Sequence, residues 1–175
     1  MQTFINRMIR AARLDAGLYE EVEADAGAMG QAVGVIVLSA VAAGLGTGRG
    51  IGSIMVGSLV ALLGWYVWAY LIYWIGTRLL PERETRATYD ELLRCLGFAA
   101  SPGLIRVLGV VPGLRGIAFL AGSIWMLVAT VIATRQALDY RSTWRAVGVC
   151  AIGWVAQVIL LGLALWLLGS FARAA

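Results

Sequence analysis

Four long stretches of this chain contain no Asp, Glu, Lys or Arg, and they constrain its fold more than any other feature. They cover residues 26–48, 50–77, 116–134 and 146–172. Each is near or above the roughly 20 residues with which a helix crosses about 30 Å of hydrocarbon. Hydrophobic residues make up 61 % of the chain and charged residues 14 %, and a soluble domain of 175 residues cannot hide that much apolar surface. We therefore expect an all-α, polytopic membrane helical bundle.

A fifth apolar stretch, residues 92–111, is interrupted by charge and by proline. It holds Arg94 near its start, Arg106 inside and Pro102 between them. A central Arg costs about 2.5–3.5 kcal/mol on the insertion scale, whereas each Leu, Ile, Phe or Val returns roughly 0.3–0.6 kcal/mol. Arg106 lies nearer one end, where its side chain can snorkel to the interface. We predict a fifth span here, with a re-entrant hairpin and four spans as the alternative.

The arginines set the predicted orientation. With five spans, ten Arg lie on the side of the N-terminus, and the other four are Arg49, Arg106, Arg115 and Arg173. The hairpin alternative gives the same ten-to-four split, so the count does not choose between the topologies. Both place the N-terminus in the cytoplasm, because cytoplasmic loops carry the excess of positive charge. We predict a multi-pass protein of the cell inner (plasma) membrane.

The first 25 residues form a polar segment that starts with the pattern of an amphipathic helix. One predicted face carries Phe4, Ile5, Met8, Ile9 and Ala12, and the opposite face carries Asn6, Arg7, Arg10 and Arg13. This pattern is typical of a short helix that lies in the headgroup plane. A helix packed on its own bundle is the alternative. We expect residues 1–25 to be a cytoplasmic segment and residues 26–175 to be the membrane domain.

Composition excludes several kinds of chemistry. The sequence has no His and no Lys, which removes His-containing triads and lysine Schiff bases. The arginines are spread along the chain, so nothing predicts a basic face for nucleic acid. Cys95 and Cys150 fall in apolar stretches and are expected to be small buried hydrophobes. We expect no catalytic residue, no metal site and no cofactor. A lipid-modifying activity is the enzymatic alternative, with interfacial acids at Glu20, Glu21, Asp90 or Asp139.

Glycines at four-residue spacing predict close contacts between helices. Among the 22 Gly are the pairs Gly30/Gly34 and Gly109/Gly113. In lipid, small residues at this spacing let helix backbones approach each other. We expect these contacts within the bundle, with a contact from Gly30/Gly34 to a second protein as the alternative.

Residues 97–106 carry the features that predict a binding site. Pro102 frees a carbonyl and kinks a helix, and Arg106 inside a span needs a partner or water. Ser101 lies about one turn from Arg106. The candidate binding residues are Arg106, Ser101, Pro102, Gly97 and Phe98. We expect a kinked packing helix with a snorkelling Arg, with an anion- or lipid-binding site, or a piece of a permeation path, as the functional alternative.

The same segment resembles a known family. Residues 97–102 read Gly-Phe-Ala-Ala-Ser-Pro, a G-[Y/F]-x-x-x-P element, with Asp-Glu-Leu-Leu-Arg at 90–94 and Arg-Gln-Ala-Leu-Asp at 135–139. With five closely spaced spans, this resembles the prokaryotic form of the Yip family (Ypt/Rab-interacting membrane proteins) over residues 26–170. The D-L-Y-G-P element of eukaryotic members is not present; residues 17–20 are at best a remnant. The resemblance implies a non-enzymatic membrane protein of trafficking, scaffolding or membrane-shaping type.

We therefore expect a non-enzymatic protein that acts through helix-helix packing as a scaffold, accessory subunit or membrane-organising factor. Its expected partners are the lipid bilayer and other membrane proteins or a second copy, and no nucleic acid. The alternative is a small transporter or channel, with Arg106 in an anion or lipid site and breaks at Pro102 and Pro112.

Overall fold

The computed structural model describes the backbone of residues 2–174 and the side chains of residues 3–163 and Trp166; within this range it contains helices, turns and loops but no strand. The elements are α1 (Gln2–Ala12), α2 (Ala16–Ala24), η1 (Ala26–Ala28), α3 (Met29–Gly46), α4 (Ile51–Trp74), η2 (Ile75–Leu79), α5 (Tyr89–Phe98), η3 (Ser101–Val110), α6 (Arg115–Ala137) and α7 (Thr143–Ala174). The predicted all-α fold is confirmed.

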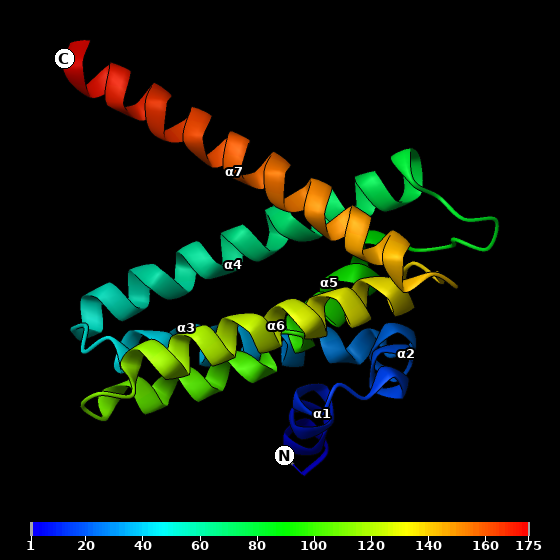
Figure 1. Cartoon of the computed structure of the whole chain (residues 1–175), viewed down its shortest axis with the longest axis horizontal. Coiled ribbons are helices and arrows are strands. Elements are labelled where there is room, and N and C mark those ends of the chain that lie inside the picture. The colour runs from blue at the N-terminus through cyan, green and yellow to red at the C-terminus, as the bar shows by residue number, and fades with distance from the viewer. Residues whose placement is uncertain (1, 175) are drawn as a thin grey trace.

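Five helical segments are long and apolar enough to cross a membrane: Ala26–Gly46, Ile51–Leu79, Tyr89–Val110, Arg115–Ala137 and Thr143–Leu163. The third runs on through α5 and η3 to the far end of the bundle and does not turn back, so the hairpin alternative does not hold (Figure 1). Of the predicted span at residues 146–172, the side chains of residues 164–172 other than Trp166 lie outside the described part, as does that of Arg173.

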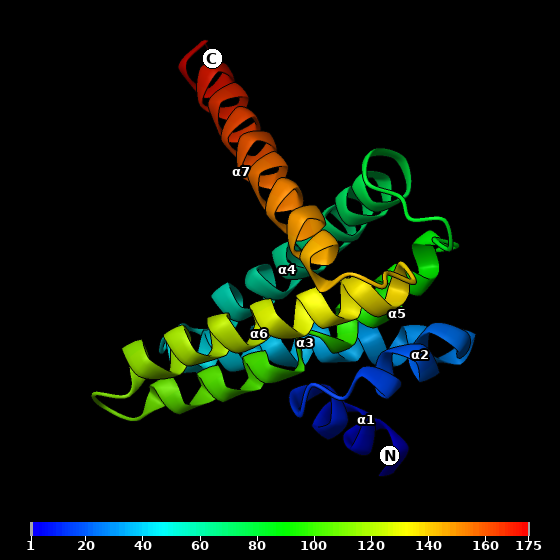
Figure 2. The same ribbon diagram turned by 45° about the vertical axis from the view of Figure 1, so that its right-hand side comes forward.

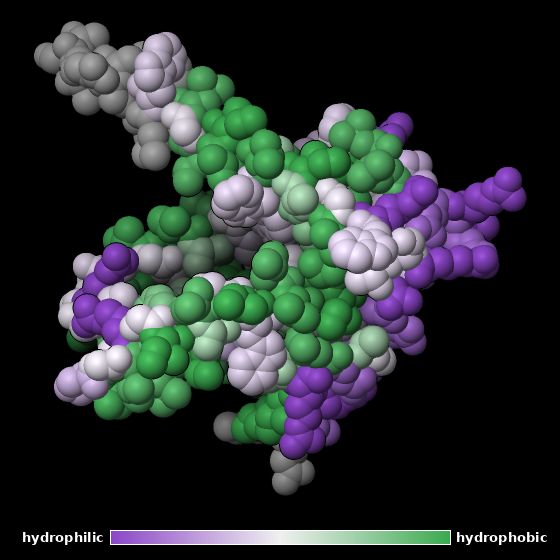
Figure 3. Space-filling model, viewed as in Figure 1, coloured by the Kyte–Doolittle hydropathy of each residue, from purple (hydrophilic) through white to green (hydrophobic). Residues whose placement is uncertain are grey.

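The bundle has two chemically different ends. All ten Asp and Glu of the sequence lie on α2, at the start of α5, or in the connections that precede α2, α3, α5 and α7. We call this the acidic end. The turns from α3 to α4 and from η3 to α6 form the arginine end, where Arg49 and Arg115 lie and the sequence places no Asp or Glu. Figure 3 shows the large hydrophilic region at one end and a small one at the other.

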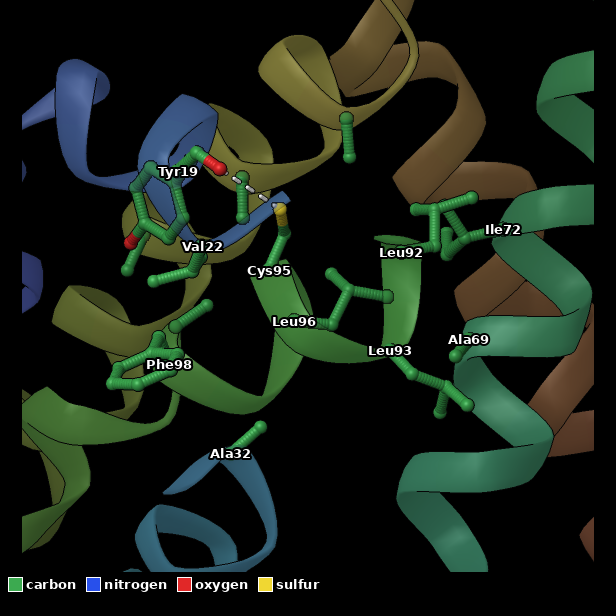
Figure 4. Close-up of a cluster of buried hydrophobic side chains, with 14 of the residues drawn as sticks. Tyr19, Val22, Ala32, Ala69, Ile72, Leu92, Leu93, Cys95, Leu96 and Phe98 are labelled. Atoms are coloured by element: carbon green, nitrogen blue, oxygen red, sulfur yellow. Dashed lines mark hydrogen bonds between the residues drawn. The ribbon is translucent and has the colours of Figure 1, made fainter. Parts of the chain in front are cut away.

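The third span is the centre of the fold. About 67 % of the residues in its most apolar part are buried inside the protein, against 17–33 % in the other four spans. Figure 4 shows α5 between three neighbours: Tyr19 and Val22 of α2, Ala32 of α3, and Ala69 and Ile72 of α4. The sequence gives α5 a defined start, because Thr88 and Glu91 form the predicted capping box.

Proline changes the helix type within this span. Pro102 has no backbone N–H, so α5 ends at Phe98 and the chain continues as the 3₁₀ helix η3. The Gly103 N–H then donates to the carbonyl of Ala100 at 2.9 Å, which is 3₁₀ spacing. The predicted kink at Pro102 is therefore a change from α to 3₁₀ geometry that persists over ten residues.

Glycines of the third span make close contacts with α3 at three positions along its length. A Cβ at Gly97 would lie 2.6 Å from the Cβ of Ala32, and one at Gly103 would lie 2.2 Å from Ser39 Oγ. A Cβ at Gly109 would lie 2.7 Å from the carbonyl oxygen of Gly46.

The spacing of these contacts explains why they stay in register. The contacts recur every six residues on the third span and every seven on α3. From Gly103 to Gly109 the third span is 3₁₀ helix, in which two turns take six residues, whereas two turns of the α-helix α3 take about seven. The two helices therefore meet again after this step.

Substitution at Gly46 is predicted to separate α3 from η3. A Cβ there would lie 2.0 Å from the carbonyl oxygen of Arg106, which is backbone and cannot move aside. We expect Gly46→Ala to destabilise the protein by about 1–3 kcal/mol, measured as thermal unfolding in detergent micelles. Gly64→Ala on α4 is the control, because nothing lies within 4 Å of that Cβ position and the change favours helix by up to about 1 kcal/mol. Equal effects of the two variants would contradict the prediction.

Glu23 is predicted to destabilise the fold at alkaline pH. Burial first, and then repulsion from Asp139, Glu91 and Glu20, raise its pKa from 4.5 to about 7. Because the folded state favours the protonated carboxyl, the unfavourable energy appears as pH rises from about 4.5 to about 7 and stays constant above. After a discount for its partial exposure, we expect Glu23→Gln to stabilise the protein by about 1–2 kcal/mol at pH 8 and by almost nothing at pH 4. A stabilisation that does not vary with pH would contradict this origin.

Candidate functional site

The N-terminal helix is tied to the bundle by a buried arginine. The Arg7 side chain is about 10 % exposed. Its Nε donates to Glu21 at 2.8 Å, its Nη2 donates to Asp25 at 2.8 Å, and its Nη1 donates to Gln31 at 3.1 Å. Charge-assisted bonds of this length are the stronger class of hydrogen bond. The bond from Arg7 lowers the pKa of Asp25, and the bonds from Arg7 and Arg10 lower that of Glu21.

Further contacts fix the direction of α1. Arg10 donates to Asp15 at 2.7 Å and also pairs with Glu21. Asp15 in turn caps α2 by accepting from the Gly17 N–H. At the end of α1, the Trp125 indole donates to the carbonyl of Ala12 at 2.8 Å. The helix therefore lies across the long helices at a fixed angle (Figures 1 and 2).

Only part of the predicted apolar face of α1 packs on the bundle. Phe4 and Met8 pack against the core, whereas Ile5 and Ile9 remain 51 % and 45 % exposed. Arg7, expected on the polar face, turns inward to the acids. The packing of α1 on the bundle is thus confirmed, and a position in the headgroup plane stays a prediction for which Ile5 and Ile9 supply an exposed apolar edge.

A groove opens between α4 and α7, and α3, the third span and α6 also contribute to its lining. The lining reaches from Arg49 at the arginine end to Thr143 in the first turn of α7. The groove has a volume of about 1430 Å³. The first turns of α7 pack on α4, where a Cβ at Gly153 would lie 3.0 Å from Ile72 and 3.4 Å from Trp68. Beyond that contact α7 diverges from α4 (Figures 1 and 2), and Figure 3 shows the hollow beneath it.

Arg106 lines this groove near its open end. Its Nη2 donates to Ser123 Oγ at 3.0 Å, and its guanidinium carbon lies 5.7 Å from the centroid of the Phe119 ring. The buried Nε has no hydrogen-bond partner among the described residues. Arg49 lines the same groove from the α3–α4 turn. Arg49 was not among the predicted binding residues, because the sequence around a single Arg in a turn does not show which other spans lie near it.

The other predicted binding residues lie away from Arg106. Gly97 contacts Ala32, and Phe98 is fully buried in the core cluster (Figure 4). Ser101 and Pro102 are buried at the start of η3, and the Ser101 hydroxyl has no partner among the described residues. None of these four lines the groove.

The predicted packing glycines occupy four different environments. Gly109 touches the backbone of Gly46, and a Cβ at Gly34 would lie 3.5 Å from Phe4. Gly30 has open space around it. Gly113 lies in the turn after η3 at φ +85°, a conformation that favours glycine.

Both cysteines are buried and free, as predicted. Cys95 donates weakly to the carbonyl of Tyr19 at 3.4 Å, and Cys150 donates to Thr134 Oγ1 at 3.4 Å. The described residues contain no group of three His, Cys, Asp or Glu side chains placed to hold a metal ion.

Comparison with known proteins places this multi-pass membrane protein in a family. No curated protein and no solved structure matches the chain. The family model of the Yip1 domain matches residues 24–169, which is more than half of the chain and includes all five candidate spans. The chain belongs to the Yip1 domain family.

Proposed function

We propose that this protein is a non-enzymatic scaffold of the trafficking type that organises the membrane around it, with α1 as the element that acts on lipid. The observation that carries the proposal is the docked amphipathic helix. Its bundle side is occupied by Phe4 and Arg7, while Ile5 and Ile9 stay about half exposed beside it. An apolar edge on a helix that crosses the spans fits the boundary between headgroups and acyl chains.

The rigid attachment of α1 is what favours an effect on the bilayer. An untethered amphipathic helix of 11 residues binds a membrane surface weakly and reversibly, because it buries little apolar area. Here the Arg7 bonds and the Trp125 bond hold the helix at one angle to the spans. Ile5 and Ile9 are then inserted into one leaflet wherever the protein lies, and they expand that leaflet locally.

The orientation follows from charge. We propose that the acidic end faces the cytoplasm at an inner (plasma) membrane, because ten of the 14 arginines lie on that side of the chain. Partners would be other membrane proteins or a second copy, which meet the bundle by helix-helix packing. Gly30 supports such a contact, because nothing lies within 4 Å of its Cβ position.

A transporter or channel has weaker support. The groove that reaches Arg106 is lined mainly by apolar side chains of α4, α6 and α7, and Arg49 is the only other charged residue among the described residues that line it. A hydrated solute at Arg106 would therefore meet few polar partners on the way to the acidic end.

The double variant Ile5→Asp/Ile9→Asp is predicted to abolish membrane organisation, because charge removes the apolar edge from the acyl region. We expect the wild-type protein, reconstituted at high protein-to-lipid ratio, to give narrower or tubular vesicles in electron cryomicroscopy. The double variant should give the vesicle diameters of protein-free lipid. Thr3→Asp/Asn6→Asp is the matched control, since it adds the same charge at exposed positions outside the apolar edge. Equal shapes for wild type and double variant would reject the proposal.

Acid is predicted to release α1 from the bundle. Arg7 lowers the pKa of Glu21 and Asp25, so their contribution to docking is present at neutral pH and is lost as pH falls below their ordinary values of 4.5 and 3.8. Amide hydrogen exchange of residues 4–12, normalised to intrinsic rates, should show constant protection from pH 8 to 5 and loss below about pH 4. Arg7→Ala should lack this protection at every pH. Loss of protection between pH 7 and 5 would show that other groups control docking.

A further inference from the structure

The groove between α4 and α7 is deeper than one leaflet. Its α4 wall runs from Ser53 at the arginine end to Trp68, a rise of about 22 Å for fifteen residues of α-helix. Half of a hydrocarbon core of about 30 Å is about 15 Å. An acyl chain that enters from the leaflet at the arginine end therefore fits within its length. Towards the acidic end the groove is lined by the first turns of α7, at Thr143, Val147 and Cys150.

The wall of the groove is suited to a hydrocarbon chain. On α4 it presents Gly57, Ala61 and Gly64, which leave room beside the backbone, and on α7 it presents Trp154 and Leu161. A Cβ at Gly57 or Gly64 meets nothing within 4 Å. The spans that line the groove therefore leave this space unfilled by their own side chains, and in a bilayer an apolar space open to lipid is filled by lipid.

The open end of the groove carries positive charge with no internal partner. Arg49 and Arg106 both line it, and neither pairs with a carboxylate in the described part of the chain. All acids of the sequence lie at the acidic end, so no rearrangement of this end brings one to them. Arg106 keeps an unbonded, buried Nε and uses one Nη for Ser123. Guanidinium donors at the interface match the oxygens of a phosphate group.

We propose that the groove is a binding site for one anionic phospholipid of the leaflet at the arginine end. The phosphate lies between Arg49 and Arg106, and an acyl chain runs along Gly57 and Gly64 towards Trp68. Phosphate and chain are both required, because the arginines select the charge and the apolar wall of the groove selects the hydrocarbon. The site is at the opposite end of the spans from α1, so its existence does not depend on the proposed function of that helix.

Native mass spectrometry of the full chain in mild detergent tests the site, with phosphatidylglycerol and phosphatidylcholine of equal chain length as probes. We expect one phosphatidylglycerol to be retained per chain, at least tenfold more tightly than phosphatidylcholine. Arg49→Gln/Arg106→Gln should weaken retention at least tenfold. Arg115→Gln is the matched control: it removes the same charge at the same end, but Arg115 donates to the Thr47 carbonyl and does not line the groove. Where the double variant does not fold, Arg49→Gln alone carries the test, since Arg49 is exposed.

A second pair of variants separates the lipid from a free anion. Gly57→Leu should fill the groove and abolish retention, while Gly52→Leu, equally uncrowded but outside the groove, should leave it unchanged. Inorganic phosphate at high concentration should not displace the lipid. Displacement by phosphate, retention in Gly57→Leu, or equal loss in Arg115→Gln would overturn the proposal. A photoreactive residue at position 57 that crosslinks to polypeptide and not to lipid would assign the groove to a partner helix instead.

Discussion

The contact between α3 and the third span is the constraint on which the rest of the structure depends. Lipid gives no hydrophobic drive for two apolar helices to associate, so their stability comes from close van der Waals packing. At Gly97 and Gly109 that packing reaches the backbone of α3, and at Gly103 it reaches the side chain of Ser39. With the third span fixed in this way, its other faces become the surfaces on which α2, α4 and α6 pack.

Local signals predicted the spans and their starts. The length of an uncharged stretch indicates whether it can span the bilayer. The capping box at Thr88 and Glu91 forms hydrogen bonds within one turn of the helix. Neither signal depends on distant residues. The register of the glycines was not predicted. Four-residue spacing assumes that both helices are α-helices, whereas η3 is a 3₁₀ helix and shifts the repeat to six against seven. Pro102 was the available signal, because it marks where the helix type changes.

Two features of the candidate sites depend on distant parts of the chain and were invisible to a helical wheel. On a helical wheel Arg7 lies on the polar face of α1. In the structure it pairs with Glu21 and Asp25, which lie 14 and 18 residues further along the chain. The groove arises because α7 diverges from α4 after Gly153. Hydropathy cannot report that divergence, because an apolar helix face is equally compatible with lipid and with another helix.

The separation of charge between the two ends connects these observations. At the acidic end, Arg7, Arg10, Arg141 and Arg145 form ion pairs with carboxylates of the same chain. Those ion pairs hold α1 and the connections between spans in place. The arginines of the acidic end therefore stabilise the protein's own structure. At the arginine end Arg49 and Arg106 have no such partner, because the sequence places no acid there. A cation kept at a membrane boundary without an internal anion is neutralised by what surrounds it, and at that depth the surrounding anions are lipid phosphates.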